Sequence, residues 1–115
     1  MKKVIAIIRP MRLEAVKAAL AEEADLTGIT VTDVRGCGRN DSKFGGIYRG
    51  HEYLVTLPPK VKLEMIVTNE QADLVVDTIV TYARTGEEGD GKIFVIPMGD
   101  VIRIRTGDRG DSAVL

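Results

Sequence analysis

Apolar residues recur along the chain in runs and at regular intervals that predict strands and helices. Residues 4–8, VIAII, form a continuous apolar run that ends before Pro10, which is typical of a buried strand. Over residues 11–24 apolar side chains return every three or four positions among charged ones, so this segment is expected to be an amphipathic helix. Residues 29–34 alternate less regularly and predict a second strand.

The second half of the chain repeats this pattern. Residues 61–67 alternate apolar and charged side chains, which predicts a strand. Asn69 is expected to cap a helix that runs to about Ala83, since asparagine satisfies the free N–H groups of a first turn. Residues 93–96 are apolar and predict another strand, and residues 101–104 predict one more short strand.

The order of these elements predicts the fold class. Two halves, about 1–35 and 61–97, each contain a strand, a helix, a glycine turn and a strand. The resulting β-α-β-β-α-β order is the split βαβ, ferredoxin-like arrangement of α+β proteins, here as one domain over residues 1–115. Residues 39–56 between the halves are polar and glycine-rich, and a loop of that length in a compact domain is usually functional or disordered. The tail, about 106–115, is polar.

The strands are apolar on both faces. VIAII and IFVI place apolar side chains at successive positions, and successive side chains of a strand point to opposite faces of its sheet. In the split βαβ fold both helices cover one face, so the other face needs a different cover. We therefore expect an oligomer joined through its sheets.

Composition and charge exclude several classes of partner. With 16 basic and 17 acidic residues the net charge is −1, so no field draws nucleic acid or an anionic membrane. The single cysteine, Cys37, excludes an intramolecular disulfide and suits a reducing compartment. Residues 4–8 are too short a run for a signal peptide or a membrane span, so we expect a cytoplasmic protein without direct membrane insertion.

Residues 85–92 contain the most distinctive local motif. The spacing from Gly86 through Gly91 to Lys92 is that of a phosphate loop, but Ile93 replaces the hydroxyl residue that would hold magnesium, and a strand follows instead of a helix. Two interpretations stay open. The segment is either a plain helix-to-strand connection, or a nest of backbone N–H groups that binds an anion with help from Lys92.

Two further groups favour an anion site more weakly. Gly36, Cys37, Gly38 and Arg39 form a glycine turn that ends in a cation, which is also the composition of an ordinary turn. Arg103 and Arg105 lie two apart on a predicted strand and so share a face, where they either bind phosphate or simply face solvent.

Four motifs closely resemble the PII signal-transduction family: RTGEEGDGKIFVIP, YRGHEY, PKVKLEMIV and VIRIRTG. The resemblance runs from Met1 to the tail, with gaps only around Asp25 and within the long loop. It implies a ferredoxin-like homotrimer that senses ATP or ADP in clefts between neighbouring subunits and is not an enzyme. It also implies that the long loop, the T-loop of the family, docks on a membrane transporter or a cytosolic enzyme, in nitrogen metabolism or nutrient uptake.

The resemblance implies a set of nucleotide-binding residues. One set surrounds the adenine and the pocket wall, a second forms the turn and loop at the phosphates, and a third reaches in from the neighbouring subunit. These are, in that order, Ile7, Thr30 and Glu64; Gly36, Cys37, Gly38, Arg39, Gly89, Asp90, Gly91 and Lys92; and Arg103 and Arg105.

The chain departs from the family pattern at the 2-oxoglutarate motif. Lys60 matches the family's lysine for this ligand, but Asn40 stands where a glutamine usually binds the magnesium that accompanies ATP, and Asp41 replaces a lysine. We expect weak or no 2-oxoglutarate binding, the alternative being a full sensor that binds it with Mg-ATP. Tyr53 matches a position that some members uridylylate, and His51 one where others carry a phosphorylated serine.

Two other functions are less well supported. A small ATPase would need a group that activates water next to a magnesium ligand, and the sequence contains no strong pair of this kind. An RNA-binding split βαβ module would need exposed aromatic residues on its sheet, and the two phenylalanines and three tyrosines form no such motif. Metal binding by His51 would need further ligands that the sequence does not indicate.

Overall fold

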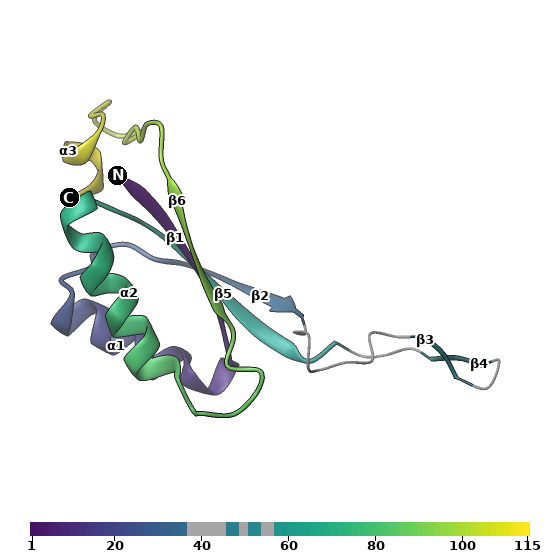
Figure 1. Cartoon of the computed structure of the whole chain (residues 1–115). Coiled ribbons are helices and arrows are strands. Elements are labelled where there is room, and N and C mark those ends of the chain that lie inside the picture. The colour runs from purple at the N-terminus through teal and green to yellow at the C-terminus, as the bar shows by residue number, and fades with distance from the viewer. Residues whose placement is uncertain (37–45, 49–50, 54–56) are drawn as a thin grey trace.

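The computed structural model describes residues 1–36 and 57–115 in full and the backbone of residues 46–48 and 51–53. Four strands form one antiparallel sheet in the order β2-β5-β1-β6, and two helices lie on one of its faces (Figure 1). The strands are β1 (Lys2–Ile8), β2 (Thr30–Arg35), β5 (Pro59–Val67) and β6 (Lys92–Pro97), and the helices are α1 (Leu13–Glu23) and α2 (Asn69–Ala83). The split βαβ prediction is confirmed.

The core lies between the sheet and the two helices. Along β1 and β5 every second side chain is buried, as the period of two in a strand requires. The register pairs Val4 with Met65 and Ala6 with Leu63, so these buried side chains share one face. They pack against Val16 of α1 and the apolar face of α2 in a single cluster. This cluster fixes the helices to one side and leaves the other side of the sheet open.

Helix α2 begins one residue earlier than the sequence indicates. Thr68 is the N-cap: its hydroxyl accepts a hydrogen bond from the Gln71 N–H, and the Gln71 side chain accepts one from the Thr68 N–H. This reciprocal pair is a capping box. The prediction that Asn69 caps the helix was therefore wrong. The side-chain oxygen of Asn69 instead accepts a hydrogen bond from the N-terminal ammonium of Met1 at 2.9 Å.

Helix α1 begins later than predicted. Residues Pro10–Arg12 form a 3₁₀ turn, and the α-helix starts at Leu13. The Arg12 side chain extends to α2, where its Nε donates to the Tyr82 carbonyl oxygen at 2.8 Å. The turn after β1 therefore ties the two helices together.

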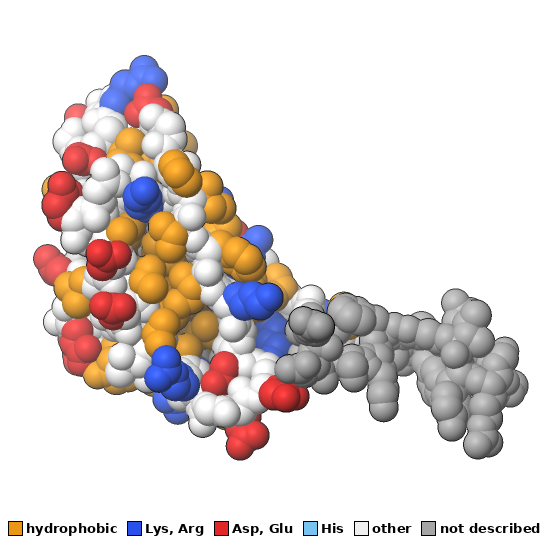
Figure 2. Space-filling model, viewed as in Figure 1, with side chains coloured by type: hydrophobic (Ala, Val, Ile, Leu, Met, Phe, Trp, Pro, Cys, Tyr) orange, Lys and Arg blue, Asp and Glu red, His pale blue; other side chains and the backbone are white. Residues whose placement is uncertain are grey.

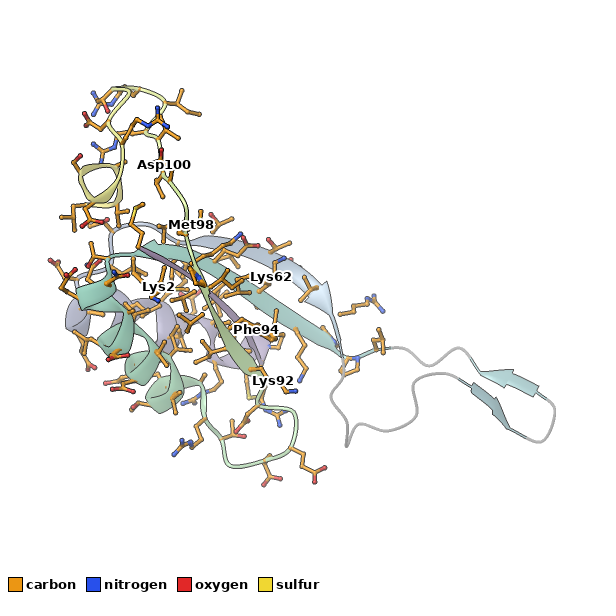
Figure 3. All side chains as sticks on the ribbon, turned by 45° about the horizontal axis from the view of Figure 1, so that its top comes forward. Lys2, Lys62, Lys92, Phe94, Met98 and Asp100 are labelled. Atoms are coloured by element: carbon orange, nitrogen blue, oxygen red, sulfur yellow. The ribbon has the colours of Figure 1, made fainter. Side chains whose placement is uncertain are left out.

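The open face of the sheet is partly apolar and partly charged. Phe94 and Ile96 of edge strand β6 are 47% and 43% exposed, as expected for a face that the helices do not cover. In the middle of this face Glu64 forms ion pairs with Lys3 at 3.0 Å and with Lys62 at 3.1 Å. Figure 3 shows Lys62, Lys92 and Phe94 on their strands.

The C-terminal segment does not form the predicted strand over residues 101–104. A single bridge between Ile102 and Arg109 takes its place, because Gly107, at φ 76°, turns the chain back on itself. The segment then ends in the short helix α3 (Asp111–Val114).

Within the long loop, β3 (Gly46–Tyr48) and β4 (His51–Tyr53) pair with each other and not with the main sheet. The sequence predicted no strand there. Throughout the part of the chain that the structure describes, no helix is long and apolar enough to cross a membrane.

Candidate functional site

Asp90 organises the glycine loop between α2 and β6. Its carboxylate accepts hydrogen bonds from the Thr85 N–H at 2.8 Å, the Thr85 hydroxyl at 2.5 Å and the Gly86 N–H at 2.9 Å. It also forms an ion pair with Arg9 Nε at 3.0 Å. The Thr85 hydroxyl and these further donors hold the pKa of Asp90 well below its usual value, although burial acts in the opposite direction. The predicted site residue Asp90 thus holds the loop in shape.

Gly91 fixes this loop against the sheet. It has φ 103°, and a Cβ built on it would lie 1.6 Å from the carbonyl oxygen of Ile7 on β1. A contact below 3.0 Å is impossible for a real Cβ, so only glycine fits. Gly91 and Ile7, both predicted as site residues, are therefore in direct backbone contact. Lys92 follows at once and pairs with Ile7 in the sheet.

Two cations meet the loop from the end of the sheet. Lys60 is only 8% exposed, and its Nζ donates to the Gly89 carbonyl oxygen at 2.6 Å. The Arg9 guanidinium donates to the Glu88 carbonyl oxygen. The side chains of Glu87 and Glu88 face solvent, as an anion-binding loop requires. Two cations therefore lie at the inner edge of the loop, and one of them, Arg9, is paired with Asp90.

The sequence does not predict the role of Arg9. At the end of an apolar run and before a proline it indicates only where a strand stops. Its role depends on a contact with Asp90, 81 positions later in the chain. No local pattern predicts such a contact.

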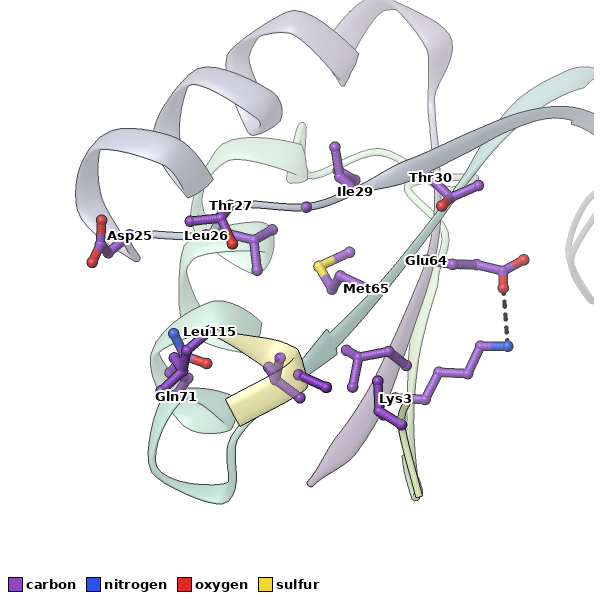
Figure 4. A pocket seen from close by; sticks show the side chains of 15 residues that line it. Lys3, Asp25, Leu26, Thr27, Ile29, Thr30, Glu64, Met65, Gln71 and Leu115 are labelled. Carbon is purple, nitrogen blue, oxygen red and sulfur yellow. Dashed lines mark ion pairs between the residues drawn. The ribbon is translucent and has the colours of Figure 1, made fainter. Parts of the chain in front are cut away.

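Thr30 and Glu64 lie elsewhere, around a cavity of about 660 Å³ (Figure 4). They are paired neighbours on β2 and β5. Hydrogen bonds from Lys3 and then Lys62 lower the pKa of Glu64, so it is a carboxylate at neutral pH. Apolar residues, including Ile29 and Met65, line the cavity together with the C-terminal segment and with polar side chains such as Asp25 and Gln71. The cavity therefore offers apolar surface and polar groups side by side, as a small-molecule site requires.

Six of the predicted residues therefore form two groups on one chain. Ile7, Asp90, Gly91 and Lys92 border a groove of about 320 Å³ between α2 and β6, where Figure 2 shows hydrophobic side chains gathered. Thr30 and Glu64 border the larger cavity, and none of the described residues lines both.

The two arginines belong to the C-terminal segment. The Arg103 guanidinium contacts Asp108 and the backbone oxygen of Leu115, and Arg105 is exposed in a turn. Because residues 101–104 form no strand, the prediction that the two arginines share one face of a strand was wrong.

Several predicted residues cannot be placed. Cys37, Gly38, Arg39 and Asn40 lie outside the described residues, and of His51 and Tyr53 the structure describes the backbone alone. Gly36 directly follows β2, and its N–H donates to the Pro58 carbonyl oxygen at 3.2 Å. Among the side chains that the structure describes, no three histidines, cysteines or acids come together as a metal site.

Fold and site together define a ferredoxin-like domain that carries an ordered glycine loop at one end of its sheet and a half-open cavity. A family model described as "Nitrogen regulatory protein P-II" matches residues 1–108. Nitrogen regulatory protein P-II of Klebsiella oxytoca is 52% identical over 114 residues, 99% of this chain and 100% of that protein. With the same coverage, P-II 1 of Escherichia coli (strain K12) is 51% identical and P-II of Nostoc punctiforme is 53% identical. The chain belongs to the nitrogen regulatory P-II family of signal-transduction proteins.

Proposed function

We propose that the chain is an adenine-nucleotide sensor, not an enzyme, and that ATP and ADP bind between neighbouring copies of it. One observation carries the proposal: the residues expected to bind the nucleotide form two separate groups on a single chain. The loop with Gly91 and Lys92 offers charge and backbone N–H groups for phosphates. The cavity at Thr30 and Glu64 offers apolar walls for a base. We expect the loop of one copy to lie against the cavity of a neighbouring copy, so that the two together form one complete nucleotide site.

The oligomer is proposed to be a homotrimer. Its support is the uncovered sheet face and edge, where Phe94, Val95 and Ile96 are more than two-fifths exposed. Ile104, next to the two arginines, is 99% exposed, which is costly for so large an apolar side chain. Light scattering is expected to give about three times the 12.5 kDa of one chain. A stable monomer would contradict both the trimer and the shared site.

The output of the sensor is proposed to be docking. The long loop over residues 39–56 would bind a membrane transporter or a metabolic enzyme according to the nucleotide present, in nitrogen metabolism or nutrient uptake. Membership of a family of regulatory proteins supports this role. Tyr53 is a candidate for covalent modification within the same loop.

2-Oxoglutarate is proposed to bind weakly or not at all. Asn40 is one methylene shorter than the family's glutamine, so its oxygen would fall roughly 1 Å short of a magnesium ion whose ligands lie at about 2.0–2.1 Å. Asp41 adds a negative charge, and at about 6 Å with an effective dielectric near 20 its repulsion is roughly 3 kcal/mol, about a hundredfold in affinity. Lys60 already donates to the Gly89 carbonyl oxygen.

Titration of 2-oxoglutarate into the Mg-ATP complex tests this proposal. We expect no micromolar binding, so that the protein reports the balance of ATP and ADP. Micromolar affinity would show that the substitutions are compensated and would support the alternative, a full sensor of both ligands.

The nucleotide proposal is tested by calorimetry with ATP and ADP. Lys92→Ala, Arg103→Ala and Arg105→Ala are each expected to weaken binding about tenfold to a hundredfold, because each removes a charge-assisted hydrogen bond. Lys17→Ala is the control, since Lys17 lies on the exposed side of α1 and, among the residues that the structure describes, pairs only with Glu14. Unchanged affinity in all three variants would refute the site, and sustained ATP turnover by the wild type would favour an enzyme.

A further inference from the structure

Arg103 is held by the chain segment that follows it. Its Nη1 lies 3.3 Å from the Asp108 carboxylate, and its Nη2 donates to the backbone oxygens of Leu115 at 2.7 Å and Ala113 at 3.4 Å. A guanidinium is planar and binds phosphate through pairs of N–H groups on one edge. In this structure both terminal nitrogens of Arg103 are engaged by residues 108–115.

The segment has a defined fold that delivers these acceptors. The Arg103 N–H donates to the Asp108 carbonyl oxygen at 2.9 Å, and the Gly110 N–H donates to the Val101 carbonyl oxygen at 3.0 Å. An ion pair between Arg109 and Asp100 at 2.6 Å closes the base of the turn. Helix α3 then brings the backbone oxygen of Ala113, and that of Leu115 directly after the helix, to Arg103.

The same segment forms one wall of the larger cavity. Val101, Ala113, Val114 and Leu115 line it opposite Thr30 and Glu64, and Figure 4 shows Leu115 beside Gln71 at one end. The position of residues 108–115 therefore affects both the shape of this half-site and the freedom of Arg103.

We propose that residues 108–115 are a latch that competes with nucleotide phosphates for Arg103. This inference rests on the proposed nucleotide site. With the latch closed, the guanidinium is occupied, and binding requires its release. The contacts are partly exposed, with 34% of the Arg103 side chain accessible, so they are weak enough to open at moderate cost. The apparent dissociation constant for the nucleotide equals the intrinsic constant divided by the fraction of chains whose latch is open. The latch therefore limits nucleotide affinity.

The contact itself is tested without nucleotide. In the closed latch the Ala113 N–H donates to the Gly110 carbonyl oxygen and the Leu115 N–H to that of Asp111. Arg103→Ala is expected to speed hydrogen exchange at these two amides severalfold while leaving amides of the core strands unchanged. Unchanged exchange would show that Arg103 does not hold the segment, and would overturn the latch.

The competition is tested by ADP titration of two variants in the full trimer background. Asp108→Asn, which removes a contact of Arg103 without removing a residue that lines the cavity, is expected to bind ADP about three- to tenfold more tightly than the wild type. Asp111→Asn is the matched control, because it also removes one negative charge from the segment but makes no contact with Arg103, and it is expected to have the smaller effect.

The outcomes separate the latch from the nucleotide site. Weaker ADP binding by Asp108→Asn would mean that Asp108 orients Arg103 for the phosphates, and would overturn the latch alone. Equal changes in ADP affinity for Asp108→Asn and Asp111→Asn would show that the loss of one negative charge is the whole cause, and this result would also overturn the latch. Absence of ADP binding by every variant and by the wild type would overturn the proposed function and the latch with it.

Discussion

Replacing Gly91 by alanine tests how the glycine loop is attached to the sheet. The new Cβ would lie 1.6 Å from the Ile7 carbonyl oxygen, so the loop or β1 must move by almost 2 Å to reach an ordinary contact. That movement separates Ile7 from Lys92, the first pair between β1 and β6. One or two lost hydrogen bonds at about 1 kcal/mol each, with roughly 1 kcal/mol of strain at positive φ, give about 3 kcal/mol. This is a large part of the typical 5–15 kcal/mol of a domain.

Urea unfolding followed by circular dichroism at fixed protein concentration measures the loss. Gly86→Ala is the control, since Gly86 has a similar φ of 92° but no atom within 4 Å of its added Cβ. The control is expected to lose only the strain of about 1 kcal/mol. Equal losses in the two variants would refute the argument that contact with β1, and not backbone conformation, makes Gly91 necessary.

Two further variants test the loop and the helix cap. Asp90→Asn is expected to lower the melting temperature at pH 7. Folding depresses the pKa of Asp90, so the carboxylate stabilises the fold fully at a pH above its ordinary pKa near 4, and this stabilisation is lost as the pH falls. The difference in melting temperature between the variant and the wild type should therefore shrink towards pH 2. A difference that does not change with pH would contradict this role. Thr68→Ala is expected to cost about 1 kcal/mol in thermal unfolding, whereas Asn69→Ala should cost less, and the reverse order would contradict the capping box.

Hydrophobic periodicity was enough to predict the sheet and both main helices. Residues 4–8 are a continuous apolar run and residues 61–67 alternate, and both form strands in which alternate side chains are buried; the helices follow from apolar residues at helical spacing. The segment at residues 101–104 is also rich in β-branched apolar residues, yet it forms no strand. The turn at Gly107 and the polar contacts of Arg103 determine its structure. The pattern of apolar and polar positions does not predict either of them.

The candidate site was predictable only in part for a similar reason. Glycine spacing and the resemblance to a family indicated Gly91 and Lys92, and the backbone contact of Gly91 with Ile7 gives the glycine a physical cause. Arg9 escaped notice because its partner Asp90 is distant in sequence. Asp90 was expected to bind the nucleotide, but its hydrogen bonds within the loop could not be foreseen from spacing. A contact between segments far apart in the chain requires the fold.

Mixing two defective chains tests the central claim, a nucleotide site shared between copies, most directly. Lys92→Ala damages the loop half, and Arg105→Ala removes a cation that we expect to reach this loop from the neighbouring copy, so each variant alone should bind ADP weakly. If the two chains are unfolded, mixed equally and refolded together, every mixed trimer contains one site with both halves intact, and about a quarter of all sites should recover wild-type affinity by calorimetry. No recovery after confirmed mixing would place both residues in a site on one chain and contradict the account.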